Sequence, residues 1–179
     1  MSLPLLDLTA RWTGPLLSTA EGAFRDEAWA DAWRDYIDTG NAPEGLDAGA
    51  EVVTLRPLSA AEMAQCEAEA GPPVQLAAFL LRGMPGEVGT IERARALAAL
   101  PDEDQAVIHR AEMRGGRLML AQARRALVSA SFAPEGTRPG DVLELLPADV
   151  RSLVLVEICR HLARIGTLGA EGKAHAGQR

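Results

Sequence analysis

The segment EVVTLRPLSAAEM, residues 51–63, holds a strand signal followed directly by a helix start. Apolar Val53 and Leu55 alternate with more polar neighbours, which is typical of a half-buried strand. Ser59 and Glu62 then have the spacing of a capping box, in which each side chain bonds the other residue's backbone N–H at the start of a helix. A strand over residues 51–56 that leads at once into a helix predicts a chain of mixed α and β structure.

Helical patterns surround this segment. The longest apolar stripe begins after Pro147 and recurs at every third or fourth position, and its breadth predicts a helix buried against more than one neighbour. Further helices are expected over 59–70, 74–82, 91–100 and 101–127. The pair Gly115-Gly116 is expected to kink or split the last of these.

Alternating residues at 127–132 predict a second short strand. Whether it pairs with residues 51–56 is left open by the sequence. The expected fold class is therefore mainly α with a minor β-hairpin or two short strands, that is α+β.

The first 50 residues differ from the rest in charge and in aromatic content. Nine acidic residues face three arginines there, although the whole chain has a net charge of only -7. A helix is expected from Ser18 or Thr19 to Asp38, with Gly40 just past its end. The turn-rich segment that follows predicts a boundary, so we expect an acidic aromatic N-terminal arm and helix (1–49), a mainly helical domain (50–168) and a flexible tail (169–179).

The aromatic residues of this arm favour two interpretations equally, a core or an interface. Trp29, Trp33 and Tyr36 share one helix face by their spacing. Trp and Tyr are also enriched at the centres of protein interfaces. As an interface, the arm would contact partners through six residues: Trp12, Trp29, Trp33, Tyr36, Leu5 and Leu6.

Composition disfavours several classes of protein. The acidic balance argues against nucleic acid as the main partner, because binders of duplex DNA carry a basic face. The N-terminus lacks a basic segment followed by a long apolar run, and no apolar run is long enough to cross a membrane, so neither a signal peptide nor a membrane partner is expected. Cys66 and Cys159 are expected to be free thiols in a reducing compartment.

Candidate chemistry is sparse. Asp38-Thr39-Gly40 matches the triplet of aspartic proteases, but it follows an acidic helix and not an apolar strand. Glu157 and His161 lie one helical turn apart, and two such residues form a side-chain pair more often than a zinc site. No catalytic residue, cofactor site or metal site is therefore predicted.

Arginines are frequent on the middle helices. Acidic residues are interleaved with them, which favours a solvated face with pairs at i, i+4. A basic strip that meets an acidic surface is one alternative. Pairing with the acidic arm of a neighbouring copy, and hence a homo-oligomer, is another.

Three stretches together resemble small proteins encoded in the structural gene clusters of tailed bacteriophages. They are EAWADAWRDYIDTGN (27–41), VVTLRPLSAAEM (52–63) and LPADVRSLVLVEICRHLARIGTLGAEGKA (146–174). The likeness is greatest to the families of tail-assembly chaperones and of tail and neck components. It covers about half of the chain, and residues 71–127 carry none of it.

The resemblance implies a role in morphogenesis without catalysis. A tail-assembly chaperone keeps a long apolar tape-measure protein in solution, so the implied partners are tail, tape-measure or neck proteins. A head–tail connector (adaptor) subunit in a ring, or a bacterial cytosolic adaptor or regulator unrelated to phage, is the alternative. The expected location is the bacterial host cytoplasm, with incorporation into the virion or a phage-like particle as a further option.

Overall fold

The computed structural model describes residues 11–42, 44–85 and 91–167. Helices dominate, and three strands form a small antiparallel sheet, so the expected α+β class is confirmed. In chain order the elements are β1 (Trp12–Leu16), the 3-10 helix η1 (Leu17–Thr19), α1 (Glu27–Thr39), β2 (Glu51–Leu55), α2 (Ala60–Ala70), α3 (Gln75–Arg82), α4 (Ile91–Ala98), α5 (Asp102–Ala126), β3 (Leu127–Ala130), the 3-10 helix η2 (Pro139–Glu144) and α6 (Ala148–Thr167).

The chain forms two compact units. The sheet unit comprises Met1–Ala64 and Met119–Arg179, and the helical unit comprises Gln65–Leu118. This division differs from the boundary expected after residue 49. The reason is that β1 pairs with β2 and that α1 packs against α6, so the described part of residues 11–49 belongs to the sheet unit.

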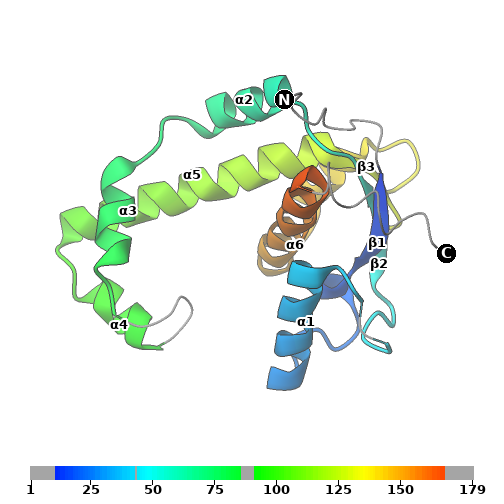
Figure 1. Cartoon of the computed structure of the whole chain (residues 1–179), viewed down its shortest axis with the longest axis horizontal. Coiled ribbons are helices and arrows are strands. Elements are labelled where there is room, and N and C mark those ends of the chain that lie inside the picture. The colour runs from blue at the N-terminus through cyan, green and yellow to red at the C-terminus, as the bar shows by residue number, and fades with distance from the viewer. Residues whose placement is uncertain (1–10, 43, 86–90, 168–179) are drawn as a thin grey trace, which may run out of the picture. The chain divides into compact units, whose positions relative to one another are not determined.

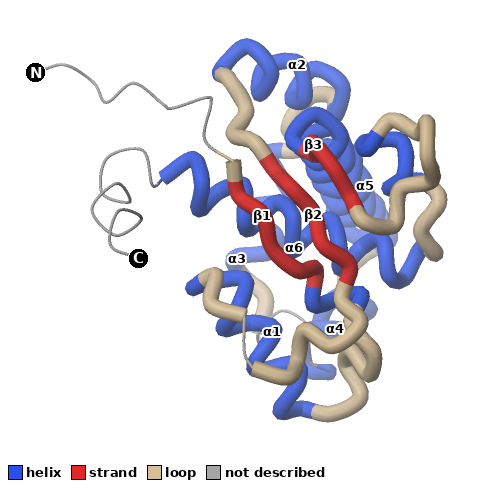
Figure 2. The backbone as a smooth tube through the Cα atoms, turned by 90° about the vertical axis from the view of Figure 1, so that its right-hand side faces the viewer, coloured by secondary structure: helices blue, strands red, loops and turns tan. Residues whose placement is uncertain are grey.

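The sheet has the order β1-β2-β3, and both pairs are antiparallel (Figure 2). Trp12 lies opposite Leu55 in the first pair, and Val53 lies opposite Ala130 in the second. The two segments expected as strands therefore do pair. β1 was not expected from the sequence, because Gly14-Pro15 interrupts any alternation of apolar and polar residues. Pro15 is tolerated in this strand because β1 lies at the edge of the sheet.

Helix α6 covers one face of this sheet (Figure 1). Its buried side chains meet those of the strands and of α5 in one core cluster: Leu16, Val53, Leu55, Ala123, Leu127, Leu143, Val154, Leu155 and Ile158. A second cluster joins α1 to η1 and contains Leu17, Ala20, Trp29, Tyr36 and Ile37. The broad apolar stripe of α6 thus packs against several neighbours, as its width indicated.

The capping box at the start of α2 is confirmed. The Ser59 N–H donates to Glu62 Oε2 at 2.9 Å, and the Glu62 N–H donates to Ser59 Oγ at 3.2 Å. Arg56 adds an ion pair with the same carboxylate at 2.5 Å. The hydrogen bonds from Arg56 and from Ser59 lower the pKa of Glu62 to about 2.

Two helices differ from the expected pattern. α1 begins at Glu27, because Asp26 caps it by accepting the Trp29 N–H at 2.7 Å, and because Phe24 before it has φ 60°. Gly40 follows its end with φ 80°, as expected. α5 runs without a break through Gly115-Gly116.

The helical unit buries few large side chains. Arg93 holds α3 and α4 together by donating to the carbonyl oxygens of Leu81 at 2.6 Å and Met84 at 2.9 Å. Arg114 pairs with Glu67 within the same unit. The unit leaves several large apolar side chains exposed: Leu76, Phe79, Ile91 and Met113. Among the described residues, no helix has both the length and the apolar character needed to cross a bilayer.

Candidate functional site

A buried carboxylate in the sheet unit holds two distant parts of the chain together. Glu157 lies on α6 and is fully buried. Its Oε1 accepts the Leu17 N–H at 2.7 Å, and its Oε2 accepts the Ser18 N–H at 3.0 Å and the Trp33 Nε1–H at 3.1 Å. Three donors offset the cost of burying this charge, so the carboxylate fixes η1 and α1 against α6.

His161 lies one turn further along α6 and is also fully buried. Its Nδ1 lies 2.8 Å from the Arg164 guanidinium. A guanidinium can only donate hydrogen bonds, so Nδ1 is the acceptor and the proton of the neutral ring is on Nε2. That nitrogen lies 3.9 Å from Glu157 Oε1, too far for a hydrogen bond, and it has no hydrogen-bond partner among the described residues. Burial lowers the pKa of His161 below its usual 6.5, and the charge of Arg164 acts in the same direction.

Aromatic rings enclose this histidine. Trp12 stacks on it with ring centroids 4.0 Å apart, and Tyr36 meets it edge-on at 4.9 Å. The Tyr36 hydroxyl donates to the Pro15 carbonyl at 2.8 Å. Burial, together with the nearby charge of Glu157, raises the pKa of Tyr36. The arrangement joins β1, α1 and α6 through polar and ring contacts, and no solvent reaches its carboxylate or imidazole.

Cys159 does not join this cluster. Its Sγ lies near the Met119 carbonyl at 3.7 Å and Gln122 Oε1 at 3.6 Å, both on α5. Within the described ranges, no three His, Cys, Asp or Glu side chains are grouped as metal ligands. Glu157 and His161 instead contact backbone amides, the Trp33 indole, Arg164 and the rings of Trp12 and Tyr36.

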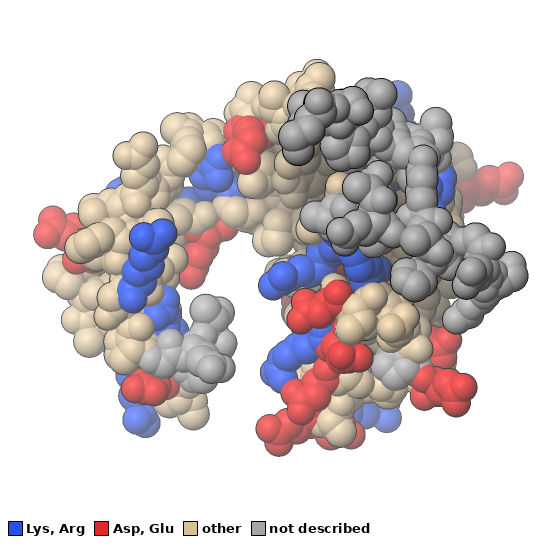
Figure 3. All heavy atoms as spheres, in the orientation of Figure 1, with Lys and Arg blue, Asp and Glu red and all other residues tan. Residues whose placement is uncertain are grey.

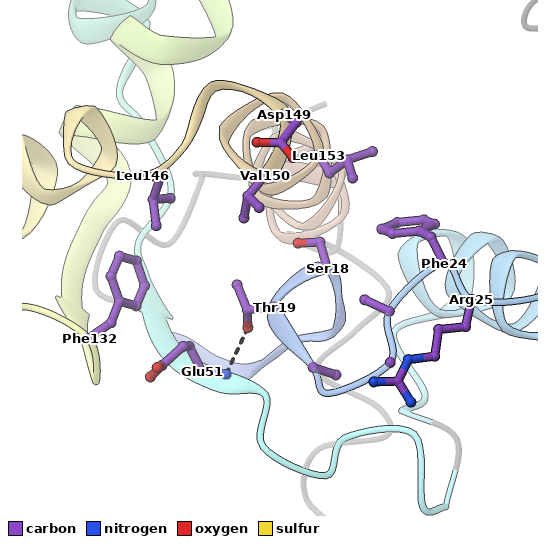
Figure 4. A pocket seen from close by; sticks show the side chains of 13 residues that line it. Ser18, Thr19, Phe24, Arg25, Glu51, Phe132, Leu146, Asp149, Val150 and Leu153 are labelled. Atoms are coloured by element: carbon purple, nitrogen blue, oxygen red, sulfur yellow. Dashed lines mark hydrogen bonds between the residues drawn. The ribbon is translucent and has the colours of Figure 1, made fainter.

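An open groove of about 670 Å³ lies beside the buried cluster (Figure 4). One wall is the chain from Ser18 to Arg25, and the other is the first half of α6. Apolar side chains from separate elements line it: Phe24, Phe132, Leu146, Val150 and Leu153. Because Glu157 bonds the amides of Leu17 and Ser18, the buried cluster positions the first wall of this groove.

Phe24 is the most unusual residue of the groove. It has φ 60°, a left-handed conformation that non-glycine residues rarely adopt. Its ring contacts Trp29 at 4.4 Å and Trp33 at 5.4 Å between centroids, and 36% of the residue stays exposed. The two tryptophans thus hold an aromatic ring at the edge of the groove.

Ser18 is the second unusual residue. It is only 5% exposed, yet its hydroxyl has no hydrogen-bond partner among the described residues. In Figure 4 this hydroxyl points between Val150 and Thr19, toward the interior of the groove. A buried hydroxyl without a partner is costly, and an unsatisfied polar group of this kind calls for an explanation.

The charged lining residues are Arg25 on the first wall, Asp149 at the start of α6 and Glu51 on β2. Glu51 also accepts a hydrogen bond from Ser131 Oγ. Figure 3 shows acidic and basic side chains interspersed over α1. The groove therefore combines an apolar interior with two carboxylates and one guanidinium in its lining.

The six residues predicted as a possible interface differ in burial. Trp29 and Tyr36 are buried, Trp12 and Trp33 are partly buried, and Leu5 and Leu6 lie outside the described residues. Sequence reasoning missed Ser18 and the side chains of the groove. The one sequence signal for the groove was the breadth of the apolar stripe on α6, because one neighbouring element cannot cover so wide a face.

Comparisons of the chain with protein-family models, with curated proteins and with solved structures gave no match.

Proposed function

We propose that this protein acts in bacteriophage morphogenesis through protein–protein contacts, as a tail-assembly chaperone-like protein or as a tail or neck component. The observation that carries the proposal is the open groove of the sheet unit. Its side chains Phe24, Leu146, Val150 and Leu153 offer apolar surface to a partner. The phage context comes from the sequence resemblance of residues 27–41, 52–63 and 146–174.

A groove of this kind suits a chaperone of an apolar polypeptide. Apolar side chains of the partner would leave water by entering the groove, which is favourable by roughly 25 cal/mol per Å² of apolar area. The net charge of -7 would keep the complex in solution, because net charge opposes aggregation.

A connector subunit in a ring is the second candidate, and one observation favours it. The helical unit exposes its own apolar side chains: Leu76 is 51% exposed, Ile91 72% and Phe79 75%. A ring subunit contacts a neighbour on each side through two different surfaces. The groove and these side chains would supply two such surfaces.

The test uses the full chain with the structural proteins encoded beside it. We expect stoichiometric copurification with one of them after co-expression. Leu153→Asp in the groove should abolish the complex, while Leu145→Asp, at a neighbouring residue that is 69% exposed and does not line the groove, should preserve it.

Mass spectrometry of purified particles separates the candidates. Stoichiometric presence in mature particles supports the tail, neck or connector role, and absence combined with copurification of a tape-measure protein supports the chaperone. If the chain neither copurifies with a phage structural protein nor occurs in particles, the proposal is wrong.

A further inference from the structure

The guanidinium of Arg164 lies where three elements of the sheet unit meet. Its Nη2 lies 2.8 Å from His161 Nδ1 on α6, and its Nη1 donates to the Tyr36 carbonyl oxygen near the end of α1 at 3.4 Å. Its guanidinium carbon lies over the Trp12 ring at the start of β1, and a Cβ added at Gly40 would meet the guanidinium. Because carbonyl groups at the end of a helix attract positive charge, Arg164 connects α6 to the end of α1 and to the start of β1.

The contact between Arg164 and His161 requires a neutral imidazole. Nδ1 accepts the hydrogen bond through its lone pair, whereas a protonated imidazole carries a hydrogen on both nitrogens and can only donate. Protonation would therefore leave two donors and two positive charges facing each other at 2.8 Å. His161 is fully buried, so salt and solvent screen this repulsion little. The contact as it stands cannot survive protonation.

The other groups around the imidazole do not reverse this effect. Among the described residues, the titratable groups that face it besides Arg164 are Glu157 on α6 and Tyr36 on α1, while β1 presents the Trp12 ring. Glu157 favours the charged ring, but its Oε1 lies 3.9 Å from Nε2 and its carboxylate already accepts three N–H groups. Tyr36 stays neutral because burial raises the pKa of its hydroxyl. Burial has the largest influence on His161 and, with Arg164, holds its pKa below the usual 6.5.

We propose that His161 and Arg164 form a proton-sensitive latch, in which protonation of His161 expels the Arg164 guanidinium and lets the last turn of α1 and the start of β1 separate from α6. The proton comes from water and adds to Nδ1, and no other covalent bond changes. The opening is local, because Glu157 still bonds the amides of Leu17 and Ser18, and because neither member of the latch belongs to the buried core cluster between α6 and the sheet. The latch is a property of this chain alone and does not rest on the proposed function.

The latch should open as the pH falls below about 6.5. In the open form His161 is in contact with water, and its pKa returns to about 6.5. The closed form binds the proton less readily. The equilibrium constant for opening should therefore be constant above this pH and rise by up to about tenfold per pH unit below it.

Amide hydrogen exchange followed by NMR measures this opening in the full chain. After correction for intrinsic exchange rates, the protection of the Ile37 and Gly40 amides should fall about three- to tenfold between pH values of about 7.5 and about 5.5. Low concentrations of urea should leave this exchange nearly unchanged, because local opening exposes little surface, but should accelerate exchange at the buried core residue Ile158. Unchanged protection at Ile37 and Gly40, or a urea dependence equal to that of Ile158, would overturn the latch.

Two arginine variants test whether Arg164 transmits the effect. Arg164→Met removes the guanidinium but keeps an unbranched apolar side chain, so the charge that opposes protonation of His161 is gone. An NMR titration should then show the pKa of His161 rising by at least about half a unit, and the pH dependence of exchange at Ile37 and Gly40 should shrink by linkage. Arg160→Met removes the same charge from an exposed position of α6 and should leave both measurements at their wild-type values. If the pKa of His161 is the same in Arg164→Met as in the wild type, the latch is wrong.

A measurement on the wild type covers the case in which Arg164→Met does not fold. The nitrogen chemical shifts of the His161 imidazole at a pH of about 7.5 should report an unprotonated Nδ1 and a protonated Nε2, because Arg164 can only donate to Nδ1. A proton on Nδ1 at this pH would mean that Arg164 does not donate to it, and the latch would then have no closed form.

Discussion

The indole ring of Trp12 lies flat on the imidazole ring of His161, with 4.0 Å between ring centroids and 24° between their planes. One residue begins the first strand and the other lies in the last helix, so this contact joins the two ends of the described chain. Arg164 lies over the Trp12 ring, with its guanidinium carbon 5.9 Å from the ring centroid. The buried cluster around His161 is thus an anchor for β1, and through Glu157 it also holds the wall of the groove.

Removing the Glu157 carboxylate should strongly destabilise the protein. Glu157→Ala leaves the buried N–H groups of Leu17 and Ser18 and the partly buried Trp33 Nε1–H without an acceptor, so we expect the free energy of unfolding to fall by about 3 kcal/mol or more. Urea denaturation measures this change. The control is Glu144→Ala, whose side chain is 52% exposed and pairs with Arg124, with an expected loss below about 1 kcal/mol. Similar losses for both variants would contradict the anchoring role.

The protein should become less stable as the pH is lowered, because of His161. Its pKa is lowered on folding, so below the unfolded value of 6.5 the unfolded chain binds more protons than the folded one. The free energy of unfolding should therefore decrease as pH falls below about 6.5, by at most about 1.4 kcal/mol per pH unit from this group.

The measurement for His161 is urea denaturation at several pH values between about 7.5 and 5. His161→Phe keeps a ring against Trp12 but cannot titrate, so its stability should depend less on pH in this range. His109→Gln, at an exposed position of α5, should keep the wild-type pH dependence. An unchanged slope in His161→Phe would show that another group causes the effect.

Gly40 and Gly45 should respond differently to the same substitution. Both have φ 80°, so alanine introduces left-handed strain of about 1–2 kcal/mol at each. At Gly40 an added Cβ would also meet the guanidinium of Arg164, while at Gly45 it would meet nothing within 4 Å. That guanidinium cannot move freely, because it bonds His161.

We therefore expect Gly40→Ala to lose more stability than Gly45→Ala, as measured by thermal or urea unfolding. In an Arg164→Ala background the further effect of Gly40→Ala should shrink to that of Gly45→Ala. Equal losses in the wild-type background would mean that Arg164 yields without cost.

Gly116→Ala should stabilise the protein. Gly116 lies inside the continuous helix α5, and a Cβ there would contact nothing within 4 Å. Alanine is favoured over glycine inside a helix by up to about 1 kcal/mol, so the midpoint of urea denaturation should rise. A fall in the midpoint would indicate that α5 needs the freedom of glycine at this point.

Much of the local structure could be predicted because its causes lie within a few residues. The alternation of Val53 and Leu55 predicted β2, and Ser59 with Glu62 predicted the start of α2. The start of α1 could not be predicted in this way, because Phe24 adopts a positive φ that its own residue type disfavours. Its contacts with Trp29 and Trp33 account for that conformation.

The amino-acid sequence by itself determined the α+β class, the capping box and the long apolar helix α6, because propensity, capping and periodicity act over one or two helical turns. The tertiary structure decided that Glu157 receives the amides of Leu17 and Ser18, that Trp12 covers His161 and that a groove opens beside them. These contacts join residues more than a hundred positions apart, and no pattern within one segment can encode a partner supplied by another.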